Sequence, residues 1–110
     1  MTGPLQDWVD GGPEPDRATR KAAVKESLAE LARRAPGRSV EVRVPPFGAV
    51  QCIEGPRHTR GTPPNVVETD PRTWLALVLG VTRWGDAVAD GSVRASGSRA
   101  GDVAGLLPLA

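Results

Sequence analysis

The hydrophobic period of the chain changes at Pro36-Gly37, and this change constrains the fold more than any other feature. Before it, apolar residues recur at the three- and four-residue steps of one α-helical face, at Val24, Leu28, Leu31 and Ala35. After it, apolar and polar residues alternate in Val40-Glu41-Val42-Arg43-Val44, which is the period of a strand with one wet face. The chain is therefore predicted to combine helices and strands within one small domain.

Helix start and stop signals divide the rest of the chain. Asp16 and Asp70 are good N-caps, and they begin predicted helices over 17–35 and from Pro71 to the stop at Gly80. Two shorter helices are predicted over 83–90 and 99–107, and three further strands over 47–54, 66–69 and 93–97, of which the first is expected to be central. Because the strands do not alternate strictly with helices, the pattern predicts an α+β fold with helices on one face of a mostly antiparallel sheet.

The length of 110 residues is sufficient for one modest hydrophobic core. Residues 1–15 are dense in Gly and Pro, which break regular structure, so they are predicted to form a disordered N-terminal tail. Trp8 within this tail is expected to dock loosely on the domain. The folded domain is predicted to comprise residues 16–110.

The charge balance and the single cysteine exclude several classes of protein. A net charge of +1 without a long basic stripe does not favour nucleic acid as a partner. Cys52 is the only cysteine, so no intrachain disulfide is expected, and a reducing compartment suits the chain. No apolar run approaches the ~20 residues of a membrane span, and the first residues lack the order of a signal peptide. We therefore expect a cytoplasmic protein without stable membrane insertion.

Catalytic chemistry has few candidate residues in this sequence. Hydrolysis or group transfer needs a nucleophile beside a base, or a metal with three or four ligands, whereas the chain has one histidine, His58, and one cysteine, Cys52. Cys52 lies on a predicted strand and is expected to be a small buried apolar residue. No phosphate loop, dinucleotide motif or zinc spacing is present in the sequence. We expect no catalytic residue, no metal and no cofactor.

A polar cluster lies between the second and third predicted strands. Arg57, His58 and Arg60 are accompanied there by two threonines, Thr59 and Thr62. Guanidinium groups match carboxylate and phosphate oxygens bidentately, so this cluster can bind an acidic head group. The alternatives are that these residues pair with nearby acidic side chains and fix the loop, or that they form a protein-docking surface.

An apolar stripe is the second candidate site. It runs along the three C-terminal helices at helical spacing and is predicted to face the sheet, through Trp74, Val78, Trp84, Val88, Leu106 and Leu107. Such a stripe fits a packed core as well as the wall of a cavity.

The order of residues in the C-terminal half resembles that of sterol carrier protein domains. A capped helix, a glycine, a short helix, a glycine with a strand and a final apolar helix follow one another, at Thr69-Asp70, Trp74-Leu75, Gly80, Trp84, Ala87, Gly91, Val93, Ser96-Gly97 and Leu106–Leu109. With residues 40–47 and the loop 55–68, the chain looks like the short bacterial branch of that family. The resemblance covers about residues 40–109.

This resemblance implies a five-stranded sheet covered by helices, with an apolar tunnel between them that accepts a fatty acid, an acyl chain or another lipid. We therefore expect a non-enzymatic lipid-binding domain, in which the six stripe residues contact the apolar ligand and Arg57, His58 and Arg60 orient its head group. The alternative from another class is a protein-interaction module, in which the same fold has a filled core and docks on a partner enzyme.

Overall fold

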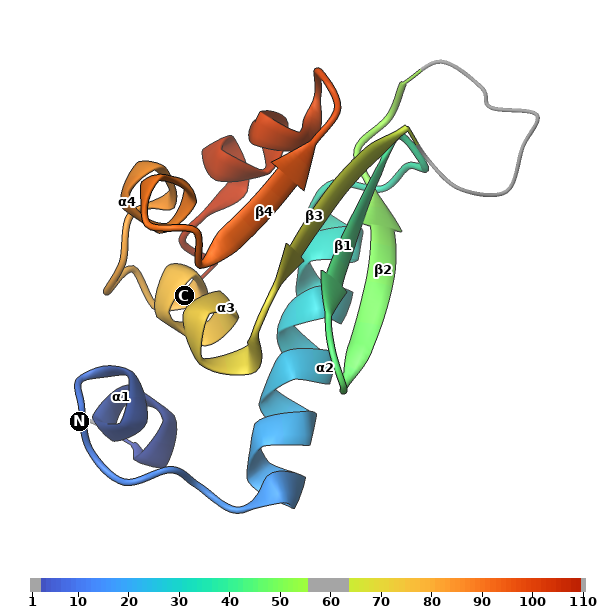
Figure 1. Ribbon diagram of the computed structural model, residues 1–110. Coiled ribbons are helices and arrows are strands. Elements are labelled where there is room, and N and C mark those ends of the chain that lie inside the picture. Colours follow the sequence, from blue (N-terminus) through green and yellow to red (C-terminus); the bar gives the residue numbers. More distant parts are fainter. Residues whose placement is uncertain (1–2, 56–63, 110) are drawn as a thin grey trace.

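The computed structural model describes residues 3–55 and 64–109 of the chain (Figure 1). Its helices are α1 (Pro4–Val9), α2 (Arg17–Arg34), α3 (Pro71–Val78), α4 (Trp84–Ala89) and the 3₁₀ helix η1 (Ala100–Leu106). Its strands are β1 (Val40–Val44), β2 (Gly48–Cys52), β3 (Asn65–Thr69) and β4 (Val93–Ser96). The predicted α+β class is confirmed.

The sheet differs from the expected one in strand number and direction. Within the described residues it has four strands in the order β2-β1-β3-β4. The outer pairs are antiparallel, but β1 and β3 are parallel, with Val40 opposite Asn65. The prediction of a five-stranded, mostly antiparallel sheet is therefore wrong, and the sheet is mixed. The cause is topological, because β2 ends at the sheet end where β1 begins, and β3 starts at this same end beside β1.

Strand β2 lies at the edge of this four-stranded sheet rather than at its centre. The sequence suggests a central strand because both alternating sets of residues 47–54 contain apolar side chains. In the structure, Phe47 and Ile53 lie outside the strand and Ala49 is exposed, whereas Val50 and Cys52 face the core. Phe47 and Ile53 thus belong to the flanking turns, and the one member of this set within the strand, Ala49, is exposed, so β2 is not covered on both faces.

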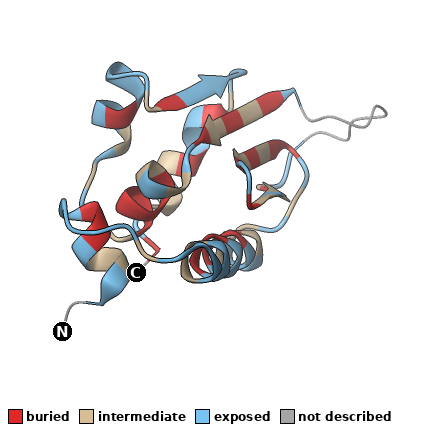
Figure 2. Cartoon of the chain, turned by 60° about the horizontal axis from the view of Figure 1, so that its bottom comes forward, coloured by how far each residue is buried: buried red, intermediate tan, exposed pale blue. Residues whose placement is uncertain are grey.

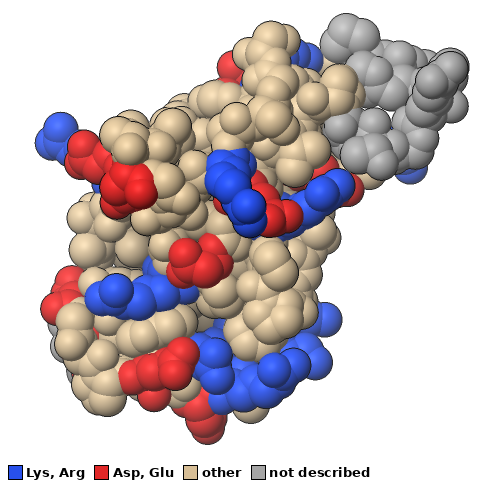
Figure 3. Space-filling model, in the orientation of Figure 1, with Lys and Arg blue, Asp and Glu red and all other residues tan. Residues whose placement is uncertain are grey.

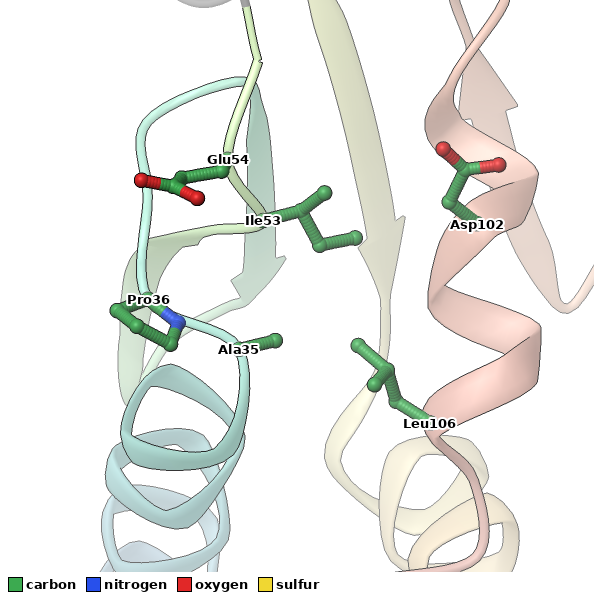
Figure 4. Close-up of a pocket in the computed structure, with 6 residues that line it drawn as sticks. All are labelled: Ala35, Pro36, Ile53, Glu54, Asp102 and Leu106. Atoms are coloured by element: carbon green, nitrogen blue, oxygen red, sulfur yellow. The ribbon is translucent and has the colours of Figure 1, made fainter.

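One face of the sheet packs against helices, and among residues 3–55 and 64–109 no helix covers the other face. Val40, Val42, Val44 and Val67 are fully buried under the helices, and the buried segments turn toward the inside of the molecule (Figure 2). α2 and η1 lie side by side on this same face (Figures 1 and 4). The expectation that helices cover one face is met by these two elements.

The opposite face of the sheet carries charged side chains in register across the strands. Arg94 on β4 lies opposite Glu68 on β3, and its Nη2 donates to Glu68 Oε2 at 2.6 Å. Arg43 likewise donates to Glu41 along β1. Acidic and basic side chains are consequently intermingled on this face (Figure 3), and their charges compensate one another.

The N-terminal residues contain a helix where the sequence predicts disorder. α1 buries Trp8 and Val9, and it packs against α3. The breakers that suggest a tail lie at the ends of this helix, because Pro4 occupies its first turn and Gly11-Gly12 follow it. Leu5, Trp8 and Val9 share one face at three- and four-residue spacing. Docking of this face stabilises a helix that is too short to persist alone.

Candidate functional site

A cleft opens between the C-terminal end of α2, the residues that follow β2, and η1 (Figure 4). It has a volume of about 410 Å³ and is lined by Ala35, Pro36, Ile53, Glu54, Asp102 and Leu106. Ala35, Ile53 and Leu106 point toward one another across it, while the carboxylates of Glu54 and Asp102 point away from its centre (Figure 4). We call this space the η1 cleft. It has apolar walls and an acidic rim.

Ile53 enters the η1 cleft because its backbone is held in an uncommon conformation. Its φ is +67°, in the left-handed region that β-branched residues rarely adopt. Three hydrogen bonds hold it there. The Ile53 N–H donates to the carbonyl of Ala35 at 2.7 Å, and the Ile53 carbonyl accepts from the N–H of Ser39 at 3.1 Å and from Ser39 Oγ at 2.6 Å. Strained backbone of this kind clusters at binding sites, where neighbouring structure enforces it.

Asn65 fixes the position of η1 relative to the sheet. Its side chain is almost fully buried at the start of β3. Nδ2 donates to the carbonyl of Ser39 at 2.8 Å, and Oδ1 accepts from the N–H of Arg99 at 2.9 Å. Arg99 in turn donates through Nε to Asp102 Oδ2 at 3.2 Å. One amide therefore joins the residue before β1, the start of β3 and the residue before η1.

The six apolar residues predicted to bind the ligand do not line one cavity. Leu106 lines the η1 cleft, whereas Val78 lines a separate depression between α1, α2 and α3. Trp84 and Leu107 are half-buried against the core. Val88 is 40% exposed on the surface of α4.

Trp74 belongs to the interior of the core. It has no exposed surface, and its indole Nε1 donates to Ser27 Oγ at 2.8 Å. The spacing of Trp74 and Val78 correctly places both on the inner side of α3, but periodicity cannot distinguish a residue that packs from one that lines a space. The structure assigns Trp74 to the packing between α2 and α3.

The other predicted site residues are Arg57, His58 and Arg60, which lie outside the described residues. Their role toward an acidic head group stays a prediction. The η1 cleft itself is formed mainly by residues that the sequence does not single out. Ile53 gives no signal, because nothing in the sequence marks a β-branched residue for a left-handed backbone. Pro36-Gly37 is recognised only as a helix stop, although it borders the cleft.

Cys52 is fully buried, as the sequence predicts. Burial raises the pKa of its thiol to about 11, so the thiol stays protonated and is a weak nucleophile at neutral pH. In the part of the chain that the structure covers, no three His, Cys, Asp or Glu side chains gather as a metal site would require. Nor does any helix there have the length and apolar character needed to cross a membrane.

The mixed sheet and the helices on its inner face define an α+β domain. Residues 16–109 match the family described as bacterial SCP ortholog, and the chain belongs to this family. The resemblance found in the sequence is thereby confirmed. No curated protein matches the chain.

Proposed function

We propose that this chain binds a lipid or acyl-type apolar ligand in the η1 cleft and that it does so without catalysing a reaction. The observation that carries the proposal is the convergence of Ala35, Ile53 and Leu106, from three separate segments, on one open apolar space. The strained backbone of Ile53 supports it, because a β-branched side chain is held toward the cleft at a cost in conformational energy. Membership of the family supports the same ligand class.

The size of the η1 cleft suits a single hydrocarbon chain. Its volume of about 410 Å³ lies at the lower end of the ~300–1,000 Å³ that small-molecule sites occupy. Affinity would come from apolar burial, at roughly 25 cal/mol for each Å² removed from water. The ligand is therefore proposed to be one acyl chain rather than a two-chain lipid.

The head group is proposed to be acidic and to be bound by Arg57, His58 and Arg60, which follow the rim residue Glu54 closely in the chain. At the other side of the cleft, Asp102 is paired with Arg99 at 3.2 Å, which offsets its charge. An acidic ligand is expected to bind more tightly than an uncharged one of equal chain length, because guanidinium groups bind carboxylates through charge-assisted hydrogen bonds.

The proposal is tested by titrating the full chain with dodecanoate and dodecanol in a calorimeter. Ala35→Phe places a large side chain in the cleft and should weaken binding of both probes at this site at least about tenfold, while Leu106→Ala removes one wall and should weaken it about threefold to tenfold. Val88→Ala alters an exposed residue away from the cleft and serves as the matched control. Circular dichroism checks that each variant is folded.

Binding that is absent in the wild type, or equal in all three variants, would reject the η1 cleft as the ligand site. Equal affinity for the acid and the alcohol would reject the proposed head-group role. The alternative function is a protein-interaction module with a filled core, and the complete burial of Trp74 between α2 and α3 favours it. The interaction-module function would be supported by three results together. Neither probe binds, no lipid is extracted from protein purified from its own host, and one protein partner co-purifies in an amount equal to that of the chain.

A further inference from the structure

A second apolar depression lies between α1, α2 and α3, away from the η1 cleft. Its volume is about 380 Å³, and both ends of the chain contribute to it, with Leu5 from α1 and Leu109 near the C-terminus. Val78, the last residue of α3, and Leu79, which follows it, form the facing wall. The two chain ends lie on the same side of the molecule (Figures 1 and 2). We call this space the α1 groove.

The wall that α1 contributes lies outside the family match. The family match begins at residue 16 and so excludes α1. The helix is anchored by the buried side chains of Trp8 and Val9, and Arg72 Nε donates to the carbonyl of Trp8 at 3.2 Å. Leu5 is left half-buried at the groove. Trp8 and Val9 thus anchor α1, and Leu5 on the same helix contributes apolar surface to the groove.

The wall opposite α1 includes Leu109. Two hydrogen bonds hold the backbone of this residue in place. The Leu109 N–H donates to the carbonyl of Val78 at 3.0 Å, and Arg34 Nη2 donates to the Leu109 carbonyl at 2.8 Å. Glu30 accepts from Arg34 and from Arg33, and thus holds the Arg34 side chain in place. The groove is accordingly a formed space with two anchored walls.

The polar side chains that line the α1 groove differ in whether they are free to bind a ligand. Ser27 has its hydroxyl fully used, because Oγ donates to the carbonyl of Val24 and accepts from Trp74 Nε1. Glu30 is engaged with two arginines. Glu26 is exposed at the rim and forms no ion pair with the residues that the structure describes. An apolar chain in the groove would therefore meet a carboxylate at its polar end.

We propose that the α1 groove binds a single-chain amphiphile with a positively charged head group, such as a long-chain primary amine. The alkyl chain lies against Leu5, Val78, Leu79 and Leu109, and the ammonium group pairs with the Glu26 carboxylate. This site uses residues separate from those of the η1 cleft, so it is independent of the function proposed above.

The experiment titrates the full chain carrying Ala35→Phe, which fills the η1 cleft, with dodecylamine and dodecanol at neutral pH by calorimetry. Dodecylamine is expected to bind about twofold to fivefold more tightly than dodecanol, which is the size of an exposed ion pair. Glu26→Gln should remove this preference and leave dodecanol binding in the groove unchanged. Asp86→Asn, which alters an exposed acid on α4, is the matched control and should keep the preference.

Two further variants separate the two sites. Leu79→Ala removes apolar wall from the α1 groove and should weaken amine binding, whereas Ala35→Phe in the η1 cleft should leave it unchanged. Amine binding that is lost in Ala35→Phe and insensitive to Glu26→Gln would overturn the groove proposal while the function proposed for the η1 cleft stands. Amine binding that depends on Glu26, in a protein that fails to bind dodecanoate, would support the groove and reject the function proposed for the η1 cleft.

Discussion

Gly37 occupies a position that a side chain cannot share with the neighbouring backbone. Its φ is +150°, and a Cβ built on it would collide with the carbonyl group of Ile53 and the amide nitrogen of Glu54. This close approach brings the turn after α2 against the residue that enters the η1 cleft. Glycine is required at this position for both its backbone conformation and its lack of a side chain.

Replacing Gly37 with alanine is therefore expected to lower the free energy of unfolding by roughly 2–4 kcal/mol, through strain and displacement of the Ile53 backbone. Urea unfolding followed by tryptophan fluorescence measures the change. Gly101→Ala is the matched control, because a Cβ there meets nothing within 4 Å, and it should change stability by less than about 1 kcal/mol. Equal effects of the two substitutions would contradict the role assigned to Gly37.

At the scale of elements, Asn65 connects pieces of structure that are distant in sequence. Asn65→Ala leaves the carbonyl of Ser39 and the N–H of Arg99 without their side-chain partner. The loss of two buried hydrogen bonds should cost about 2–3 kcal/mol of unfolding free energy. Because η1 is then less firmly held to the sheet, affinity of the η1 cleft for dodecanol should also fall.

Thermal or urea unfolding together with calorimetric titration checks both effects of Asn65→Ala. Gln51→Ala, on the uncovered face of the sheet, provides the comparison and should change stability by about 0.5 kcal/mol or less. An Asn65→Ala variant that is less stable but binds dodecanol as before would show that this amide does not position the cleft.

The elements could be predicted from the sequence more completely than their arrangement. The capping residues Asp16 and Asp70 each accept from the backbone N–H three residues on, at 2.8 and 2.9 Å, as the sequence indicates. α2, β1 and α3 follow the predicted ranges closely, since local periodicity and caps specify them. The predicted helix over 99–107 is a 3₁₀ helix instead, in a segment whose Gly101 and Gly105 disfavour a regular α-helix.

The arrangement depends on contacts that are remote in sequence. The parallel pairing of β1 with β3 joins residues about 25 positions apart, and strand periodicity does not report such a contact. The η1 cleft is likewise formed by residues near 35, 53 and 106, and no local pattern relates them. The family resemblance identified the class of fold but not which residues line the available space.

At the scale of the whole molecule, one ion-pair network joins the long helix to the C-terminal segment. Glu30 accepts from Arg33 and Arg34, and Arg34 also donates to the carbonyl of Leu109. Hydrogen bonds from Arg33, then from Arg34, lower the pKa of the Glu30 carboxyl from its ordinary 4.5 to about 2. This carboxylate remains ionised in the folded protein at pH values where it is protonated in the unfolded chain.

The stabilising contribution of Glu30 should therefore be complete above about pH 4.5 and should disappear as the pH falls toward about 2. The difference in unfolding free energy between the wild type and Glu30→Gln, measured in urea at pH 7, 4 and 3, is expected to decrease in that order. Asp86→Asn serves as the control for general acid effects. A difference that is constant over this range would show that Glu30 does not couple to folding in this way.

Leu5 and Leu109 stand within one groove, although they come from opposite ends of the amino-acid sequence. A domain whose entry and exit points are neighbours can be spliced into a surface loop of a larger host without pulling its halves apart. The same proximity means that whatever is fused at either end is presented beside the mouth of this groove. Attachments made beside Leu5 or Leu109 for labelling or immobilisation will consequently stand near the α1 groove, whereas the charge-compensated face of the sheet remains clear.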